Sequence, residues 1–171
     1  MSRPEQARTM VQQLSDFLRG TLRKDNQQRV SLADELTQLE LYLAIEKVRF
    51  GHRLQTIVDV TDDAKNLKLP ALLLQPIVEN AIKFGLYGTT GDTTITIKAD
   101  QEEAGLVIRI QNPFDSDALQ AQEGTGFGLS SVQRRLYLLY ARPNLVQTQQ
   151  HENQFITTVT IPQNYDQVPH N

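Results

Sequence analysis

Two pairs of strand-like runs constrain the fold of this chain more than any other feature. In each run β-branched and other apolar residues alternate with polar ones, which is the period of a half-buried strand. The first pair covers residues 93–99 and 106–110, and the second covers 145–151 and 155–161. The connections within the pairs have the size of hairpin loops, so the strands of each pair are expected to run antiparallel.

Segments with helical periodicity lie between and around these strands. Helices are expected over 4–24, 31–50, 69–86 and 127–141, and one further strand is expected over 53–60. The mixture of helices and hairpins predicts an α+β fold. We expect a two-layer sandwich, in which helices cover one face of a mixed, mostly antiparallel sheet.

Local signals set the expected ends of two helices. Ser31 has the residue type of an N-cap. Asp34, three residues on, is a better capping partner for it than Glu35, four residues on, and Gly51 is expected to end that helix. Pro76 lies inside the third helical run, so this helix is expected either to be kinked or to start late. Residues 61–66 are expected to form a polar turn.

Composition excludes several classes of protein. The chain has 171 residues, of which 17 are Lys or Arg and 20 are Asp or Glu, so the net charge is −3. This mild acidity argues against a main function in nucleic-acid binding. With no cysteine, the chain has no disulfide, thiolate metal site or cysteine nucleophile. No apolar run approaches the roughly 20 residues of a membrane helix, and no secretory signal is visible, so a soluble intracellular chain is expected.

Asn80 is the first candidate for binding chemistry. Helical spacing places it beside Ile77 and Phe84, on a face that is otherwise apolar. An unpaired buried amide costs about 1–3 kcal/mol, so Asn80 needs a partner. Its amide oxygen could bind a hard cation, and Lys83 could reach a phosphate. In the alternative interpretation Asn80 is bonded to water at the helix edge, and Glu79 forms an i,i+4 ion pair with Lys83.

A glycine-rich segment is the second candidate. Residues 124–129, Gly-Thr-Gly-Phe-Gly-Leu, open a helix after an expected flexible loop at 112–126. Glycines let the backbone approach a phosphate, and a helix start presents free N–H groups to it. The spacing matches neither the dinucleotide fingerprint nor the Walker A loop. The alternative is a loop that needs positive φ before a helix. Asn112, before Pro113, could be a polar group at a pocket mouth or simply a turn starter.

The histidines and serines give no catalytic pattern. His52, His151 and His170 are too far apart in sequence for a recognisable metal-ligand spacing. Ser130 and Ser131 lack the context of a nucleophile elbow. No catalytic residue is therefore predicted beyond a nucleotide site.

In order and spacing, the candidate segments resemble the ATP-binding domain shared by gyrase-type ATPases and sensor histidine kinases (the GHKL fold). The similarity is closest to LytS-type sensor histidine kinases and extends over about residues 10–162. Residues 72–83, Leu-Leu-Leu-Gln-Pro-Ile-Val-Glu-Asn-Ala-Ile-Lys, resemble the N box of that family. Residues 42–51 resemble the family's segment before the first strand. Residues 124–129, with the helix that follows, resemble the G2 box, and Asn112 stands at the G1 box.

The resemblance implies a role for each matching residue. Asn80 would coordinate a Mg²⁺ ion that bridges the ATP phosphates, and Lys83 would contact phosphate. Residues 113–123 would form a short lid, hinged at the glycines of the G2 box. The implied cofactors are ATP and Mg²⁺, and the implied ATP-binding residues are Asn80, Lys83, Asn112, Gly124, Thr125, Gly126, Gly128 and Leu129.

Three departures from the family pattern stand out. The G1 box usually supplies an Asp that accepts a hydrogen bond from the adenine amino group, whereas Asn112 can accept that bond only without charge assistance. The N box commonly ends Lys-His-Gly, and here Phe84 replaces the histidine. The His-Phe-Leu-Phe-Asn-like phosphoacceptor motif does not occur in this sequence. The resemblance therefore implies a phosphoacceptor histidine outside this chain.

The resemblance also implies a domain organisation. Residues 1–30 would be a remnant helix of the dimerisation hairpin, residues 31–163 the catalytic ATP-binding domain, and residues 164–171 a tail. This domain would transfer the γ-phosphoryl group of ATP to the external histidine, and a response regulator would then receive it. The full protein would be a membrane-associated homodimer with this domain in the cytoplasm and no nucleic-acid partner. The alternatives are a degenerate nucleotide-binding or scaffold domain, or an anti-sigma-type serine kinase on the same fold.

Overall fold

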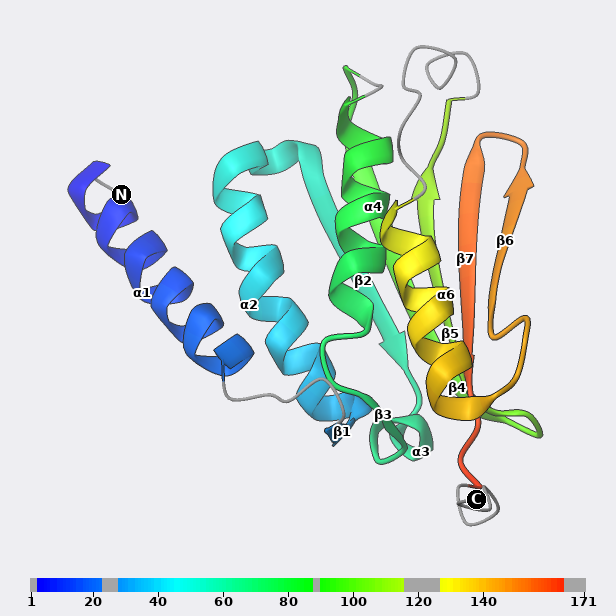
Figure 1. Cartoon of the computed structure of the whole chain (residues 1–171). Helices are drawn as coiled ribbons and strands as arrows, with labels where there is room; N and C mark the ends of the chain where they lie inside the picture. Colours follow the sequence, from blue (N-terminus) through cyan, green and yellow to red (C-terminus); the bar gives the residue numbers. More distant parts are fainter. Residues whose placement is uncertain (1–2, 23–27, 88–89, 116–126, 165–171) are drawn as a thin grey trace.

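The fold consists of one layer of helices on one layer of sheet, as the sequence predicts (Figure 1). The computed structural model describes residues 3–22, 28–87, 90–115 and 127–164. The helices are α1 (Arg3–Leu22), α2 (Leu32–Phe50), the 3₁₀ turn η1 (Gly51–Arg53), α3 (Asp62–Lys65), α4 (Leu74–Tyr87) and α6 (Phe127–Tyr140). The strands are β1 (Arg29–Ser31), β2 (Leu54–Val60), β3 (Lys68–Pro70), β4 (Thr93–Glu102), β5 (Gly105–Pro113), β6 (Val146–His151) and β7 (Gln154–Ile161).

The main sheet has five strands in the order β2-β4-β5-β7-β6. Strand β2 runs parallel to β4, with Thr56 opposite Ile95, and every other neighbouring pair is antiparallel. Both predicted hairpins are confirmed, as β4–β5 and β6–β7. The prediction of a mixed, mostly antiparallel sheet is therefore confirmed. A small second sheet pairs β1 with β3, and it was not predicted because three-residue strands are too short to show a period.

The third helical run splits into two elements. Its first residues form β3, and α4 starts only at Leu74, so the late start is confirmed and the kink is not. Pro76 is then the third residue of α4. A backbone N–H at this position has no acceptor within the helix, so the absence of one in proline costs no helical hydrogen bond. The expected polar turn at 61–66 contains the single helical turn α3, in which Lys65 Nζ lies 2.8 Å from Asp62 Oδ1.

The predicted ends of α2 are confirmed. The Ser31 hydroxyl accepts a hydrogen bond from the backbone N–H of Asp34 at 3.1 Å. Gly51 ends the helix with φ +60°, a left-handed conformation that glycine adopts without steric penalty. These caps fix the length of α2, which lies between α1 and α4 in the helix layer (Figure 1).

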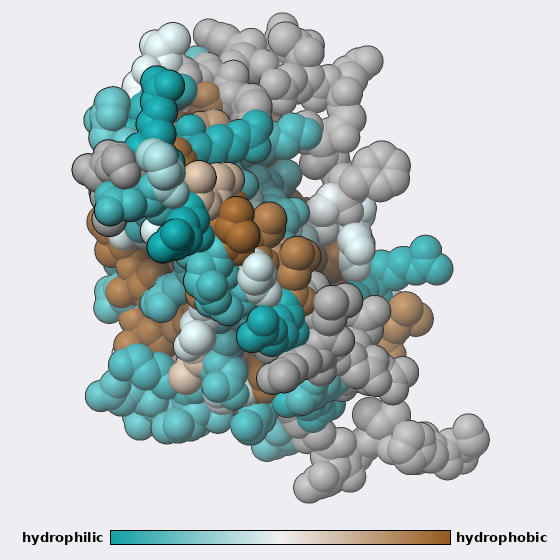
Figure 2. Space-filling model, turned by 90° about the vertical axis from the view of Figure 1, so that its left-hand side faces the viewer, coloured by the Kyte–Doolittle hydropathy of each residue, from teal (hydrophilic) through white to brown (hydrophobic). Residues whose placement is uncertain are grey.

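The core lies between the sheet and helices α2, α4 and α6. Its largest fully buried side chains include Leu74 and Ile77 of α4, Ile95 and Ile97 of β4, Ile108 and Ile110 of β5, and Leu136 of α6. Helix α1 lies at the edge of the helix layer, beyond α2, and none of its described side chains is buried. Figure 2, which views the molecule from that side, shows hydrophobic side chains at the surface there.

Candidate nucleotide-binding site

The predicted site residues come from three elements, two of which pack against the third, α4. Asn80 and Lys83 lie on α4, Asn112 lies at the end of β5, and Gly128 lies in the first turn of α6. A Cβ atom on Gly128 would be 3.5 Å from the backbone oxygen of Pro76. The start of α6 therefore packs closely on the first turn of α4.

Three phenylalanine rings join α4 to the end of β5. The Phe84 ring centroid lies 6.3 Å from that of Phe155, and the Phe114 centroid lies 5.6 Å from the same ring. Phe155 is also the strand partner of Asn112. Because Phe84 follows Asn80 by one helical turn on the same face, this cluster brings that face of α4 to the end of β5.

Asn112 is almost completely buried, with 1% of its surface exposed. Its side-chain nitrogen Nδ2 donates a hydrogen bond to the backbone oxygen of Pro113 at 2.8 Å. This bond is made by Nδ2 and does not involve Oδ1. Oδ1 is the side-chain atom that could accept a hydrogen bond from an adenine amino group.

The two predicted phosphate-side residues differ in exposure. Asn80 is half-buried, whereas Lys83 is exposed. The alternative in which Glu79 pairs with Lys83 is wrong, since no such ion pair forms between these two described residues. Glu79 instead accepts a hydrogen bond from Gln75 Nε2 at 2.8 Å. The Lys83 ammonium group is therefore not held by the helix that carries it.

Part of the predicted site lies outside the described residues. Gly124, Thr125 and Gly126, and most of the expected lid, belong to the segment 116–126. Gly128 and Leu129 are described, and both are half-buried in the first turn of α6.

Glu35, which the sequence offers only as a less suitable capping partner than Asp34, has a different role in the structure. This residue of α2 is only 2% exposed, and its carboxylate accepts hydrogen bonds from the backbone N–H groups of Leu72 at 2.9 Å and Leu74 at 3.0 Å. The signal was present in the sequence, because Glu35 shares the apolar face of α2 with Leu32 and Leu39. A carboxylate on such a face requires a partner in the interior.

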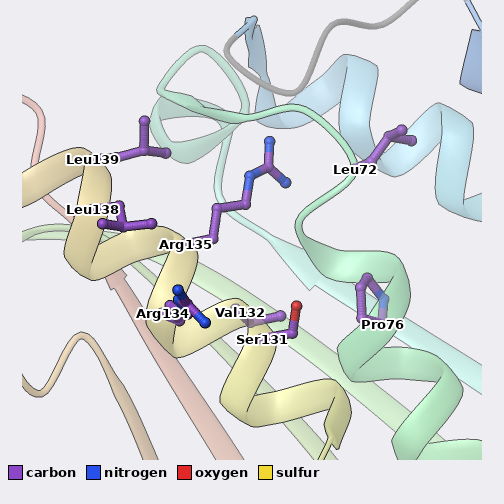
Figure 3. Close-up of a pocket in the computed structure, with 8 residues that line it drawn as sticks. All are labelled: Leu72, Pro76, Ser131, Val132, Arg134, Arg135, Leu138 and Leu139. Atoms are coloured by element: carbon purple, nitrogen blue, oxygen red, sulfur yellow. The ribbon is translucent and has the colours of Figure 1, made fainter.

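A groove of about 510 Å³ lies between α6 and the turn that precedes α4. Arg135 extends from α6 toward that turn (Figure 3). Burial lowers the pKa of its guanidinium group, and the negative charge of Glu35 opposes this shift. The groove contains none of the predicted ATP-binding residues; it is lined by Leu72, Pro76, Ser131, Val132, Arg134, Arg135, Leu138 and Leu139.

The described ranges contain neither a candidate metal cluster nor a candidate membrane span. No cluster of three or more His, Asp or Glu side chains in these ranges could hold a metal ion. No helix within them is long and apolar enough to cross a membrane.

Histidine kinases are the known proteins to which this chain is similar. The family described as "Histidine kinase" matches residues 1–54. The chain is 35% identical to the sensor histidine kinase YpdA of Escherichia coli over 147 residues, which cover 80% of this chain and 26% of YpdA. It is 34% identical to the sensor protein LytS of Staphylococcus haemolyticus over 147 residues, which cover 80% of this chain and 25% of LytS. The chain thus spans about a quarter of the length of these relatives.

Solved structures show the same fold at low sequence identity. The histidine kinase AdeS of Acinetobacter baumannii superposes with a TM-score of 0.58 at 16% identity, over 90% of this chain and 77% of AdeS. The catalytic domain of the histidine kinase ThkA superposes with a TM-score of 0.57 at 14% identity, over 80% of this chain and 96% of that domain.

The fold is therefore that of a histidine kinase catalytic domain, a class of domain that uses ATP. Within that class, the chain belongs to the LytS-, YpdA- and BtsS-type sensor histidine kinases. It corresponds to their catalytic ATP-binding region.

Proposed function

We propose that the chain binds Mg·ATP where α4, the end of β5 and the start of α6 meet, and delivers the γ-phosphoryl group to a histidine outside it. The aromatic cluster carries this proposal. Phe155 contacts Phe84, one turn from Asn80, and is the strand partner of Asn112. These contacts support one site for a metal ligand and an adenine acceptor that are 32 positions apart in sequence.

At the phosphate end, Asn80 would hold the magnesium ion. Its amide oxygen is a hard ligand, and the described residues offer no carboxylate cluster to compete for the ion. One protein ligand fits Mg²⁺, because this ion commonly keeps several waters and takes substrate phosphates as further ligands. Lys83, which is exposed and not paired with Glu79, would place its ammonium group on a phosphate.

At the other end of the site, Asn112 would accept a hydrogen bond from the adenine amino group through Oδ1. Gly128 and Leu129 stand at the start of α6, where free backbone N–H groups favour an anion. Gly124, Thr125 and Gly126 would complete the phosphate contacts. Phosphoryl transfer depends mostly on positioning and charge stabilisation, which such a cradle supplies.

The whole protein would have further partners. We propose that residues 1–30 belong to a dimerisation hairpin, that 31–163 form the catalytic unit and that 164–171 are a tail. The phosphorylated histidine would pass its phosphoryl group to a response regulator. The structure of ThkA in complex with the response regulator TrrA, similar in fold with a TM-score of 0.55, supports such a partner class. The full protein would be a membrane-associated homodimer.

Transfer of labelled phosphate tests this function. The chain is mixed with γ-labelled ATP, Mg²⁺ and a fragment that supplies a phosphoacceptor histidine. We expect label on the fragment that is lost in acid, as phosphohistidine is acid-labile, and no label with Asn80→Ala. Acid-stable label would identify a serine kinase. ATP binding without transfer would favour the scaffold alternative, which Phe84 and the uncharged Asn112 motivate.

A further inference from the structure

Glu35 is a buried carboxylate outside the nucleotide site. It comes from α2, whereas both of its hydrogen-bond donors belong to the segment that starts α4. Carboxylates are almost never fully buried unless they are paired, because removing the charge from water is unfavourable. Two charge-assisted backbone hydrogen bonds compensate for that burial here.

Both donors lie in a short segment whose backbone is energetically unfavourable without a partner. Leu72 has φ +58°, a left-handed conformation that is uncommon for a residue other than glycine and raises its energy. Leu74 is the first residue of α4, so its N–H has no acceptor within the helix. Glu35 therefore holds a strained turn in place and caps the helix that follows it.

We infer that Glu35 is a positioning residue, which fixes the start of α4 and thereby aligns Asn80 and Lys83 with the nucleotide. This inference rests on the proposed function. Asn80 lies six residues beyond Leu74, or about 9 Å along the helix axis, so a tilt at the helix start moves both side chains. Misplacement of binding groups by about 1 Å is enough to weaken binding and catalysis strongly.

The helix that carries this carboxylate, α2, is also bonded to α1. Gln38, three residues after Glu35 on α2, donates a hydrogen bond to the backbone oxygen of Phe17 in α1 at 3.1 Å. Arg135 of α6 lines the groove of Figure 3, and the negative charge of Glu35 acts to raise the pKa of its guanidinium group. The alignment of α4 thus depends on α2, which is itself bonded to α1.

The test compares Glu35→Gln with Glu40→Gln in the 171-residue chain. Glu40 is an exposed glutamate on the same helix, so its variant controls for the loss of one negative charge. The dissociation constant of Mg·ATP is measured by calorimetry, at a temperature where circular dichroism shows each variant fully folded. We expect Glu35→Gln to weaken binding by about tenfold, since a carboxamide cannot accept both hydrogen bonds, and Glu40→Gln to leave it unchanged.

A second-site change separates positioning from general stability. Glycine adopts positive φ freely, so Leu72→Gly relieves the strain that Glu35 opposes. Added to Glu35→Gln, it should restore part of the lost affinity, although it removes an apolar side chain. Amide hydrogen exchange at Leu74, measured without nucleotide, should be faster in Glu35→Gln than in Glu40→Gln.

Two results would overturn the positioning role of Glu35. If Glu35→Gln exchanges faster at Leu74 but binds Mg·ATP as tightly as Glu40→Gln, Glu35 is only structural and the inference is wrong. If the unsubstituted chain binds no ATP, the proposed function fails first and the inference fails with it. If Glu35→Gln does not fold, Glu35→Asp, which keeps the charge but is one methylene shorter, takes its place under the same criteria.

Discussion

Helices α1 and α4 differ sharply in how they are held. Helix α1 is the longer, with 20 residues against 14, yet none of its described side chains is buried. Its Met10, Val11, Leu14 and Leu18 are exposed. In α4 the buried side chains are Leu74, Ile77, Val78, Ala81, Ile82 and Leu86. A binding site needs a rigid scaffold, so the difference explains why the candidate ligands are on α4.

Truncating one apolar side chain in each helix should give the largest contrast. Ile77→Ala leaves a cavity in the core, and we expect it to lower the free energy of unfolding by about 2–5 kcal/mol. Leu14→Ala changes a side chain that is 43% exposed, and we expect a loss below about 1 kcal/mol. Urea denaturation measures both, and equal losses would mean that α1 is as firmly packed as α4.

The end of α4 offers a second comparison. A Cβ atom on Gly85 would overlap the Thr93 side chain, whose hydroxyl donates to the backbone oxygen of Gly85 at 2.6 Å. We expect Gly85→Ala to destabilise the domain by about 1–3 kcal/mol, as overpacking does. At Gly91 an added Cβ meets nothing within 4 Å, so Gly91→Ala should stay within about 0.5 kcal/mol. Thermal unfolding distinguishes the two.

The cap of α2, the helix between α1 and α4, should have a smaller effect. Ser31→Ala removes the hydroxyl that accepts from the N–H of Asp34, and we expect a loss of about 1 kcal/mol. Ser31→Asp keeps an acceptor in that position and should retain most of the stability. Chemical denaturation of both variants measures this difference, and equal stability of the two would show that the cap contributes little.

The most local effect is expected where α1 meets α2. Gln38→Ala removes the hydrogen bond to Phe17, with an expected loss of about 0.5–1.5 kcal/mol. The sharper readout is hydrogen exchange, which should become faster in α1 and stay unchanged in α4. Gln12→Ala, which removes only a hydrogen bond to Asp16 within α1, is the matched control. Unchanged exchange in α1 would show that other contacts hold this helix.

The features that could be predicted are those encoded by local periodicity. Alternation over 93–110 and 145–161 predicted both hairpins, and Ser31 and Gly51 predicted the ends of α2. The three-residue strands β1 and β3 and the left-handed turn at Leu72 gave no such signal. They depend on partners distant in sequence, as Leu72 does on Glu35, 37 residues away.

The candidate site was predictable to a similar degree. Helical spacing placed Asn80 and Phe84 on one face, Asn112 was a candidate polar group before Pro113, and the family resemblance gave it a role at the G1 box. Only the structure shows that Phe155 joins these segments. The alternative pairing of Glu79 with Lys83 was wrong: Gln75, four residues earlier on the same helix, donates a hydrogen bond to Glu79 instead. Spacing alone could not decide between these two neighbours of Glu79.

Calorimetric titration of the chain with ATP, with and without Mg²⁺, tests the nucleotide site most directly. Asn80→Ala serves as the test variant and Asn66→Ala, an exposed asparagine beyond α3, as its control. We expect magnesium-dependent binding that Asn66→Ala retains and Asn80→Ala loses. Absence of binding at millimolar ATP, or equal affinity of the two variants, would contradict a nucleotide site at Asn80.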